Sequence, residues 1–378
     1  MLDSQRDCFD LPDEAIYLNT AGMGPRLHAV SRAAHAEVDA SARPWMTPPA
    51  ALHQTAETVR ALLASLSATT AEGWALVPSM SYGAALAARN LPLRAGQQVV
   101  LPARSYPSEV YAWQDAAARA EAQLCFVEPR EGQGWTEALL QAIDSRTAVV
   151  AVPPCHWLDG ALIDLAAVSQ AARKVGAAVV IDASQALGAL PLDPVAWQAD
   201  FVFSVGHKWL LGPYGFAYLH AAPRWQAQGQ PLEGAVAGRD AGPDASRISD
   251  YAEPWQAGAR RFDAGECLRF AAAAAAIAAL QQVQQWGVAA IHARLSALTE
   301  RLAREAPRYG CRVPAERAGH FIGLHLPDGS GPSLRPRLRA ARIYAPIRGD
   351  ILRIAPHLHT RDADLDRLCE LLQDGSRG

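Results

Sequence analysis

Two residues at the ends of neighbouring apolar runs have the types needed for covalent chemistry. Asp182 ends the run AAVVID, and Lys208 follows the run FVFSV within FVFSVGHKWLLGPYG. A carboxylate after a buried strand is desolvated, so a nearby cation or proton stabilises it. A lysine in a dry, cationic pocket loses its proton more easily and becomes a nucleophile. The structural alternatives are a helix N-cap for Asp182 and a salt-bridged or solvent-reaching Lys208.

Lysine is rare in this chain. Lys174 and Lys208 are the only two, and arginine supplies the remaining basic residues. A lysine that persists at a strand end against such a bias hints at a function, although chance retention explains two lysines equally well.

Two further strand ends carry residues suited to binding a flat anionic ligand. The turn VPSMSYGAAL (77–86) presents hydroxyl groups and free N–H groups where a helix begins, which is a favourable place for an anion. The segment LPARSYPSEVYAW (101–113) places Tyr106 just after a strand, where its ring could stack on a ligand. Helix capping by Ser79 or Ser81, and core packing of Tyr106, are the structural alternatives.

Taken together, these residues describe a pyridoxal phosphate (PLP) site. Such a site needs a lysine that forms a Schiff base, a carboxylate that keeps a pyridinium nitrogen protonated, an anion cradle and an aromatic ring. A free lysine amine is only about one part in 2,500 unprotonated at pH 7, so the pocket must lower its pKa.

The elements that would position these residues alternate along the chain. Apolar runs separated by helical patterns predict a mainly parallel sheet buried between helices, an α/β fold. Ligands of such sheets bind beyond the carboxyl ends of the strands. The expected strands are 74–78, 98–102, 123–129, 148–154, 177–182, 201–205 and 216–220. The expected helices are Tyr82–Asn90, Ser108–Glu121, Trp135–Ile143 and Leu165–Val175.

The pattern changes in the last third of the chain. Residues 226–261 are rich in Gly, Pro, Asp and Arg and are expected to form a long loop. Helices over 270–286 and 289–306, strands over 320–326 and 350–356, and a helix over 362–372 indicate a smaller α+β domain. We therefore expect a large domain over 15–250 and a small domain made of 1–14 and 251–378.

Composition narrows the function classes. The 378 residues carry a formal charge of −3, half are hydrophobic and 19% are charged, which argues against nucleic-acid binding and against disorder. No apolar stretch is long enough for a membrane span, and the start lacks the apolar core of a signal peptide. Six scattered cysteines without a CxxC pair argue against a metal site or a disulfide framework, so a cytoplasmic location is expected.

Two motifs resemble one known family. IDASQALGALPLD followed by ADFVFSVGHKWLLGPYGFAYL is similar to the class V aminotransferases, which are fold-type I PLP enzymes. This family includes cysteine desulfurases, kynureninase and isopenicillin N epimerase-like proteins. The resemblance extends from YLNTAGMGP (17–25) to LRIAPHLHTRDADLDRL (352–368). It implies a homodimer with a shared active site.

The resemblance also implies roles for residues around the cofactor ring. Lys208 matches the Schiff-base lysine, and Asp182 matches the partner of the pyridinium nitrogen. Gln185 matches the side chain near the phenolic oxygen of the ring. Tyr106 occupies the ring-stacking position, and His156 lies near the place where many relatives have an asparagine beside the cofactor.

Further roles concern the phosphate and the substrate. Ser81 and the backbone of Tyr82 match the phosphate loop, and His207 matches a phosphate-binding histidine. Arg353 matches the arginine that binds the α-carboxylate of the substrate, a role that suits a bidentate guanidinium. Asn19, in the segment YLNTAGMG, is a second candidate for substrate binding.

The sequence departs from the family at several positions. Val205 replaces a phosphate-binding serine, and Ser204 would point to the other face of the strand. Glu266 lies where relatives often have a threonine that reaches the phosphate of the neighbouring subunit. The segment RIYAPIRGD contains no cysteine where the desulfurases keep their nucleophile, which disfavours cysteine desulfurase activity.

These observations predict a PLP-dependent enzyme that acts on the α-carbon of a small amino acid, with an aminotransferase as the main hypothesis. A lyase or an epimerase uses the same first steps and stays an alternative. A non-catalytic α/β binding protein is the alternative from another class. A nucleotide-dependent oxidoreductase is weaker still, because no GxGxxG motif opens a helix after a strand in this sequence. The segments 17–24, 43–46 and 344–348 could determine specificity or be ordinary loops.

Overall fold

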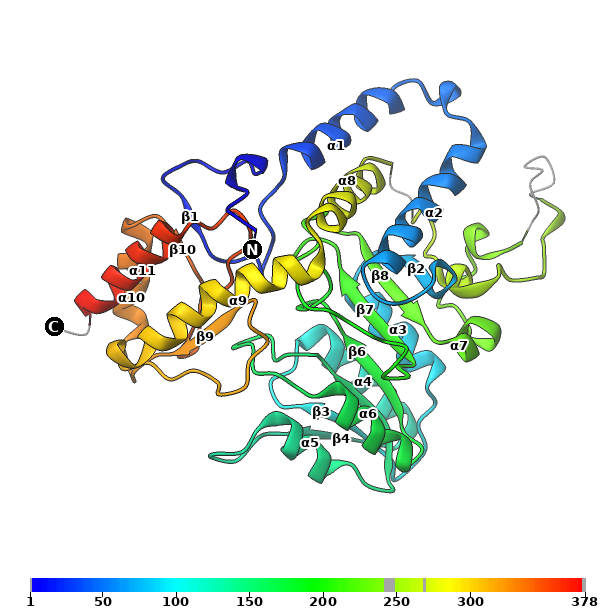
Figure 1. Ribbon diagram of the computed structural model, residues 1–378. Helices are drawn as coiled ribbons and strands as arrows, with labels where there is room; N and C mark the ends of the chain where they lie inside the picture. Colours follow the sequence, from blue (N-terminus) through cyan, green and yellow to red (C-terminus); the bar gives the residue numbers. More distant parts are fainter. Residues whose placement is uncertain (1, 241–248, 268–269, 376–378) are drawn as a thin grey trace.

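The central sheet is the element that positions the site. The computed structural model describes residues 2–240, 249–267 and 270–375, and within them seven strands form one sheet in the order β2-β8-β7-β6-β5-β3-β4 (Figure 1). All neighbours are parallel except β8, which runs antiparallel to both β2 and β7. The strands are β2 (Trp74–Val77), β3 (Gln98–Pro102), β4 (Gln123–Val127), β5 (Thr147–Val152), β6 (Ala178–Asp182), β7 (Phe201–Val205) and β8 (Ala217–Ala221).

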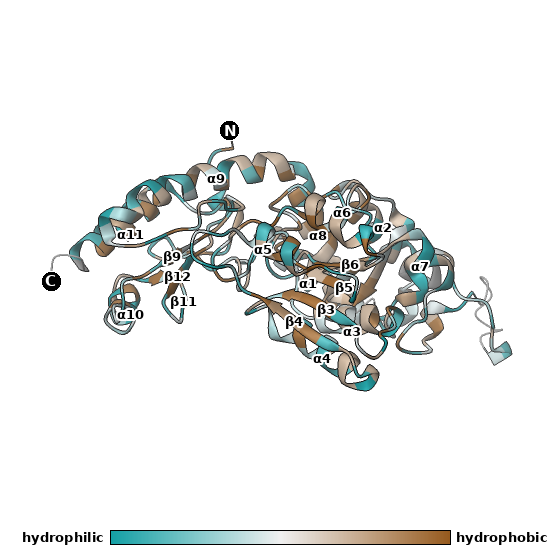
Figure 2. Ribbon diagram, turned by 90° about the horizontal axis from the view of Figure 1, so that it is seen from below, coloured by the Kyte–Doolittle hydropathy of each residue, from teal (hydrophilic) through white to brown (hydrophobic). Residues whose placement is uncertain are grey.

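Helices cover both faces of this sheet, because its strands are apolar on both faces. Alternate residues of the strands pack into two separate hydrophobic cores, one on each face of the sheet. Val99 and Leu101 of β3 belong to one core, and Val100 belongs to the other. Figure 2 shows the mainly hydrophobic strands enclosed by helices. The first face carries α3 (Met80–Asn90) and α4 (Pro107–Ala120). The second carries α5 (Trp135–Ala142), α6 (Leu165–Lys174) and α8 (Phe270–Trp286).

A smaller α+β unit follows at the C-terminal end. The strands of its antiparallel sheet lie in the order β11-β12-β9. The long helix α9 connects this unit to the central sheet region (Figure 1). The elements are α9 (Val288–Glu305), β9 (Ile322–His325), α10 (Gly331–Ala340), β10 (Ile343–Tyr344), β11 (Ile347–Arg348), β12 (Ile351–Ile354) and α11 (Asp362–Gly375). The expected α/β fold with a smaller C-terminal α+β domain is thus confirmed.

The start of the chain joins its end. Strand β1 (Ile16–Tyr17) pairs with β10 in parallel, and Asn19 bridges to Ala355. Residues just after position 15 therefore contact the C-terminal unit, although we expected the large domain to begin there. The boundaries at 15 and 250 stay a prediction.

The observed elements differ from the expected ones in a few places. The helices α1 (His28–Ser41) and α2 (Pro49–Ser65) were not expected. In α1 alanine and polar residues hide the periodicity, and Val30 is its one buried side chain. In α2 the buried Val59, Leu62 and Leu63 do form an apolar stripe, which the sequence analysis missed. The expected loop over 226–261 begins inside α7 (Pro223–Gln228) and holds the short 3-10 turns Val236–Gly238 and Gly258–Phe262. Its residues 241–248 lie outside the described part of the chain.

The described residues include neither a helix suited to a membrane nor a cluster of metal ligands. No helix in that part of the chain combines the length and the apolar character that crossing a bilayer requires. Within the same ranges, no group of three or more His, Cys, Asp or Glu side chains is arranged to hold a metal ion.

Several histidines are buried in the core without a charge partner. His320 donates from Nε2 to the carbonyl oxygen of Gln185 at 2.5 Å, and His359 donates to that of Tyr17 at 2.7 Å. Burial lowers the pKa of His320 and His359 to about 4, and that of His357 to about 3. These side chains are therefore neutral in the folded protein at neutral pH.

The buried histidines make the fold sensitive to acid. Below about pH 6.5 the unfolded chain binds protons that these folded imidazoles do not, so stability falls as the pH drops toward 4. We expect the free energy of unfolding to decrease by about 1.4 kcal/mol per pH unit for each histidine that stays neutral. Urea denaturation at pH 7.5, 6.5 and 5.5 measures this slope. Equal urea midpoints at the three pH values would contradict it.

Candidate active site

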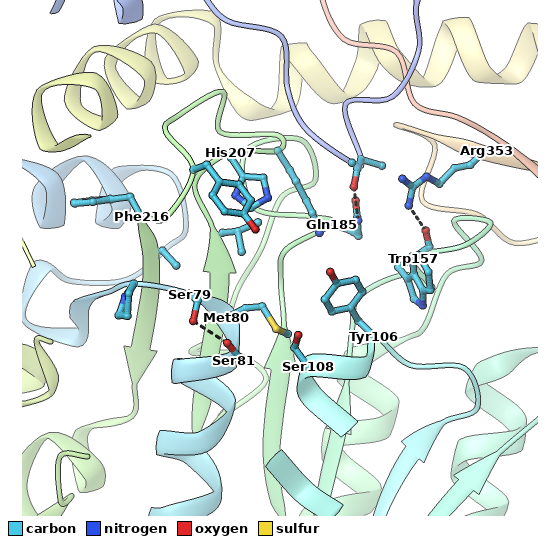
Figure 3. A pocket seen from close by; sticks show the side chains of 18 of the residues that line it. Ser79, Met80, Ser81, Tyr106, Ser108, Trp157, Gln185, His207, Phe216 and Arg353 are labelled. Atoms are coloured by element: carbon cyan, nitrogen blue, oxygen red, sulfur yellow. Dashed lines mark hydrogen bonds between the residues drawn. The ribbon is translucent and has the colours of Figure 1, made fainter. Parts of the chain in front are cut away.

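A pocket lies beyond the carboxyl ends of the strands, where the sheet meets the C-terminal unit. Its volume is about 350 Å³, and Figure 3 shows its side chains converging from several elements. Of the residues expected in the site, those that line the pocket are Ser81, Tyr106, Gln185, His207, Lys208 and Arg353. Residues distant in the sequence are therefore brought to one cavity.

The charges of Lys208 and Asp182 interact at the centre of this region. Asp182 is buried at the end of β6, accepts a hydrogen bond from the backbone N–H of Ser184 at 2.9 Å, and is not a lining residue. Burial raises the pKa of Asp182, and the positive charge of Lys208 opposes this shift. The described residues show no direct ion pair between the two groups, so their attraction acts across a gap.

The amine of Lys208 is easier to deprotonate than an ordinary lysine. Burial lowers the pKa of Lys208 to about 8; the positive charges of Arg353 and Arg348 act in the same direction, while Asp182 opposes them. At pH 7, about one lysine amine in ten is then unprotonated. The lowered pKa of Lys208 is the property that the sequence analysis expects of a nucleophilic amine, and its role stays a prediction.

Tyr106 forms an aromatic wall above the lysine. It is the N-cap residue of α4, and its ring centroid lies 5.4 Å from Lys208 Nζ. The Trp157 ring packs edge-on against Tyr106, with 5.6 Å between centroids, and Trp157 Nε1 donates to the Arg104 carbonyl at 2.7 Å. One face of the Tyr106 ring is therefore held toward the cavity.

The N-terminus of α3 opens into the same cavity. Ser79 caps the helix by accepting a hydrogen bond from Tyr82 N–H at 3.1 Å, and its hydroxyl lies 2.8 Å from that of Ser81 (Figure 3). Tyr82 is not a lining residue, and its N–H is already used by the cap. Burial and the charge of Lys208 lower the pKa of His207 to about 4, so this lining imidazole is neutral.

Gln185 is held by hydrogen bonds at both ends of its amide. Nε2 donates to the Ala21 carbonyl at 2.9 Å, and Oε1 accepts from Trp209 Nε1 at 2.9 Å. The amide thus links the segment after β6 to the N-terminal segment and to Trp209. Its orientation toward the pocket is fixed (Figure 3).

Arg353 lies at the opposite end of the pocket, on β12. It is buried, donates to the Trp157 carbonyl at 3.0 Å and to Asn19 Oδ1 at 3.1 Å, and its Nε has no partner. Burial and the nearby charge of Arg348 lower the pKa of Arg353 to about 10. Asn19 does not line the pocket, so it contacts the site through Arg353.

His156 lies in the wall rather than in the cavity. Its ring stacks on Trp135 with centroids 4.7 Å apart, and its Nε2 lies 3.2 Å from the Ala103 carbonyl. The neighbouring Trp157 lines the pocket instead. A direct role of His156 in cofactor binding or catalysis stays a prediction.

The structure shows where the residues that depart from the family pattern lie. Val205 lines the pocket, whereas Ser204 is buried on the other face of β7 within 3.4 Å of the Ala183 carbonyl, as strand alternation requires. Glu266 is exposed and is not a lining residue.

Glu109 is a residue that the sequence analysis missed. It is 1% exposed on α4, its Oε1 has no hydrogen-bond partner, and burial together with the charge of Asp182 raises the pKa of Glu109 well above its usual value. Burial and the charge of Asp182 therefore both favour the protonated form of Glu109. A glutamate in the first turn of a helix reads as an ordinary dipole partner, so the sequence gives no sign of this contact.

Gly24 is required for the N-terminal segment to approach the lysine. Its N–H donates to the His207 carbonyl at 2.7 Å. A Cβ at this position would overlap the carbonyl oxygen of Lys208 and lie 2.8 Å from Leu211 Cδ2. Only glycine leaves room for this contact.

We expect Gly24→Ala to destabilise the protein by about 1–3 kcal/mol, because the new methyl group must displace the backbone at Lys208. Chemical denaturation measures the loss. Gly234→Ala is the matched control, since a Cβ there has no atom within 4 Å. Equal losses in the two variants would contradict the proposed close packing.

Glu109→Gln should change how stability depends on pH. A carboxyl group whose pKa is raised by folding costs stability as the pH rises above the unfolded value of about 4.3. We expect the gain in melting temperature of Glu109→Gln over wild type to be larger at pH 8 than at pH 5. A gain that is independent of pH would show that Glu109 is already ionised in the fold.

Solved structures share this fold. Over 98% of this chain and 99% of the other, it superposes with a TM-score of 0.88 and 20% identity on a mutant of C-DES with glycine covalently linked to its PLP cofactor. The apo cysteine desulfurase of Thermococcus onnurineus NA1 gives a TM-score of 0.84 at 17% identity, over 100% and 99% of the two chains. These similarities confirm the fold-type I architecture.

The sequence comparisons identify relatives with higher sequence identity than these structures. The chain is 25% identical over 292 residues to the uncharacterized aminotransferase YcbU of Bacillus subtilis (strain 168), covering 77% of this chain and 76% of the relative. It is 27% identical over 317 residues to isopenicillin N epimerase of Streptomyces clavuligerus, covering 79% of each. A probable cysteine desulfurase of Streptomyces coelicolor is 31% identical over 237 residues, 61% of this chain and 55% of the relative.

These relatives carry three different activities, so they do not separate the reactions for this chain. They agree with the family match, which covers residues 16–329 with "Aminotransferase class-V". The chain therefore belongs to the class V aminotransferase family, for which pyridoxal phosphate is the expected cofactor.

Proposed function

We propose that this protein is a PLP-dependent aminotransferase that acts on a small α-amino acid through Lys208. The observation that carries the proposal is the Lys208 amine, whose pKa is about 8, in a pocket that also contains Tyr106 and Arg353. When bound, PLP supplies an electron sink for the bond that breaks at the substrate α-carbon.

The residues of the pocket fit this cofactor. Lys208 Nζ is the amine that would hold the aldehyde carbon, and the buried Asp182 would keep a proton on the ring nitrogen. The Ser81 hydroxyl, the start of α3 and the neutral His207 would bind the phosphate. Tyr106 would cover one face of the ring, with Gln185 beside it.

Arg353 and Lys208 would act on the substrate itself. Arg353 would bind the α-carboxylate, and Asn19 would orient Arg353 through the hydrogen bond at 3.1 Å. Once its amine is released, Lys208 would remove and return a proton at the α-carbon. Asp182 would meanwhile keep its charge on the protonated ring nitrogen, which sustains the electron sink.

The second candidate reaction is epimerisation. Its support is the 27% identity to isopenicillin N epimerase over 79% of the chain. Elimination uses the same residues and is the third possibility. Desulfuration is disfavoured because no cysteine lines the pocket, and burial raises the pKa of the Cys155 thiol, which makes it a poor nucleophile.

A homodimer completes the proposal. The 3-10 turn Pro44–Met46, between α1 and α2, carries Trp45 and Met46, which are 77% and 70% exposed. Figure 1 shows this segment extending away from the central sheet. Such apolar side chains favour contact with a second copy.

The lysine assignment can be tested chemically. We expect PLP, followed by borohydride reduction, to leave a stable mass increase on the peptide that contains Lys208, and Lys208→Ala to lose it. Lys174→Ala is the matched control, because the exposed Lys174 is the one other lysine of the chain. Labelling of Lys174 alone, or no labelling, would contradict the proposal.

The products then separate the reactions. With the PLP-loaded protein, a new amino acid formed from an added keto acid supports an aminotransferase. Loss of chirality with deuterium incorporation supports an epimerase, and release of ammonia without an acceptor supports a lyase. Either of the last two results overturns the aminotransferase proposal.

A further inference from the structure

Two arginines share one end of the pocket. Arg348 is on β11 and Arg353 is on β12, and both line the cavity. Arg348 pairs with Ile351 across the hairpin, and Arg353 follows Ile351 by two residues. Because side chains alternate along strands, the two arginines project from the same face of the hairpin.

Both arginines lie against the same aromatic ring. The guanidinium carbons of Arg348 and Arg353 are 5.3 and 5.9 Å from the centroid of Trp157. Neither forms an ion pair with a carboxylate among the described residues, although arginines elsewhere in the chain form many. The charge of Arg348 lowers the pKa of Arg353, and an anion bound beside both would relieve this repulsion.

The two arginines differ in how they are held. Arg353 is buried and fixed by Trp157 and Asn19, so it offers a rigid site for one carboxylate. Arg348 is exposed, makes no side-chain hydrogen bond in the described structure, and stands at the pocket mouth. Its donors are available to a group that extends outward from the α-carbon.

We propose that Arg348 binds a second carboxylate, so that the preferred substrates are acidic amino acids of the size of aspartate or glutamate. The inference rests on the proposed function, since it assigns the α-carboxylate to Arg353. Arg348 is then the residue that determines specificity. Both guanidinium groups lie near the Trp157 ring, so the two carboxylates would be bound on either side of this residue or along its edge.

Binding of unreactive acids tests the two-anion site without any turnover. Isothermal titration of the PLP-loaded protein should show succinate or glutarate binding roughly 10- to 100-fold more tightly than butyrate or valerate, the range expected for a charge-assisted contact. Arg348→Gln should abolish this preference. Arg339→Gln, a matched charge loss on the exposed face of α10, should keep it.

Turnover of isosteric substrates tests specificity. We expect kcat/KM for glutamate over glutamine, and for aspartate over asparagine, to fall by roughly 10- to 100-fold in Arg348→Gln, mainly through KM. Arg348→Glu should shift the preference toward lysine or ornithine. Far-ultraviolet circular dichroism and the reduced Lys208 adduct confirm that each variant folds and holds PLP.

The outcomes are distinct. Equal losses for acidic and neutral substrates would place Arg348 on the α-carboxylate with Arg353 and overturn the inference. A wild-type preference for neutral amino acids, or equal binding of mono- and dicarboxylates, would also overturn it. Selective dicarboxylate binding by a protein that turns over no amino acid would support the anion site and refute the proposed function.

Discussion

The placement of a few charges controls the whole site. The Lys208 amine is surrounded by one buried carboxylate, from Asp182, and by the guanidinium groups of Arg348 and Arg353. The arginines make the amine easier to deprotonate, while the negative charge of Asp182 stabilises its protonated form. This balance explains why the pocket is suited to ligands that bring negative charge of their own. The proposed phosphate at one end and carboxylates at the other would satisfy it.

That balance depends on contacts between segments far apart in the chain. The N-terminal segment contributes the Asn19 oxygen to Arg353 and the Ala21 carbonyl to Gln185. Gly24 packs directly on the backbone of His207 and Lys208. The sheet alone therefore places the lysine and the aspartate, but the ends of the chain fix the arginine and the amide. The site therefore lies where the central sheet and the C-terminal unit meet, and residues of both line it.

The sequence predicted the parts of this arrangement that follow from periodicity. Buried parallel strands have a recognisable pattern, so the strand ends carrying Asp182 and Lys208 could be located. Loops have no such period, which is why His156 was favoured although its neighbour Trp157 lines the pocket. Glu109 was missed because a helical pattern shows which face of the helix a residue occupies, and not which charge on another element, here Asp182, will act on it. The alanine-rich α1 has no apolar stripe strong enough to recognise, whereas the stripe of Val59, Leu62 and Leu63 in α2 was present and was missed.

The joining of the two chain ends also has a consequence for biosynthesis. Residues 16–24 are translated long before their partners at 343–355. The nascent sheet can form β2 to β8 while Arg353 is still unmade, and β1 has no strand to pair with until β10 leaves the exit tunnel. The pocket is consequently completed only after residues 343–355 have been translated. A chain truncated before residue 343 would expose its apolar N-terminal strand and lack the substrate end of the site.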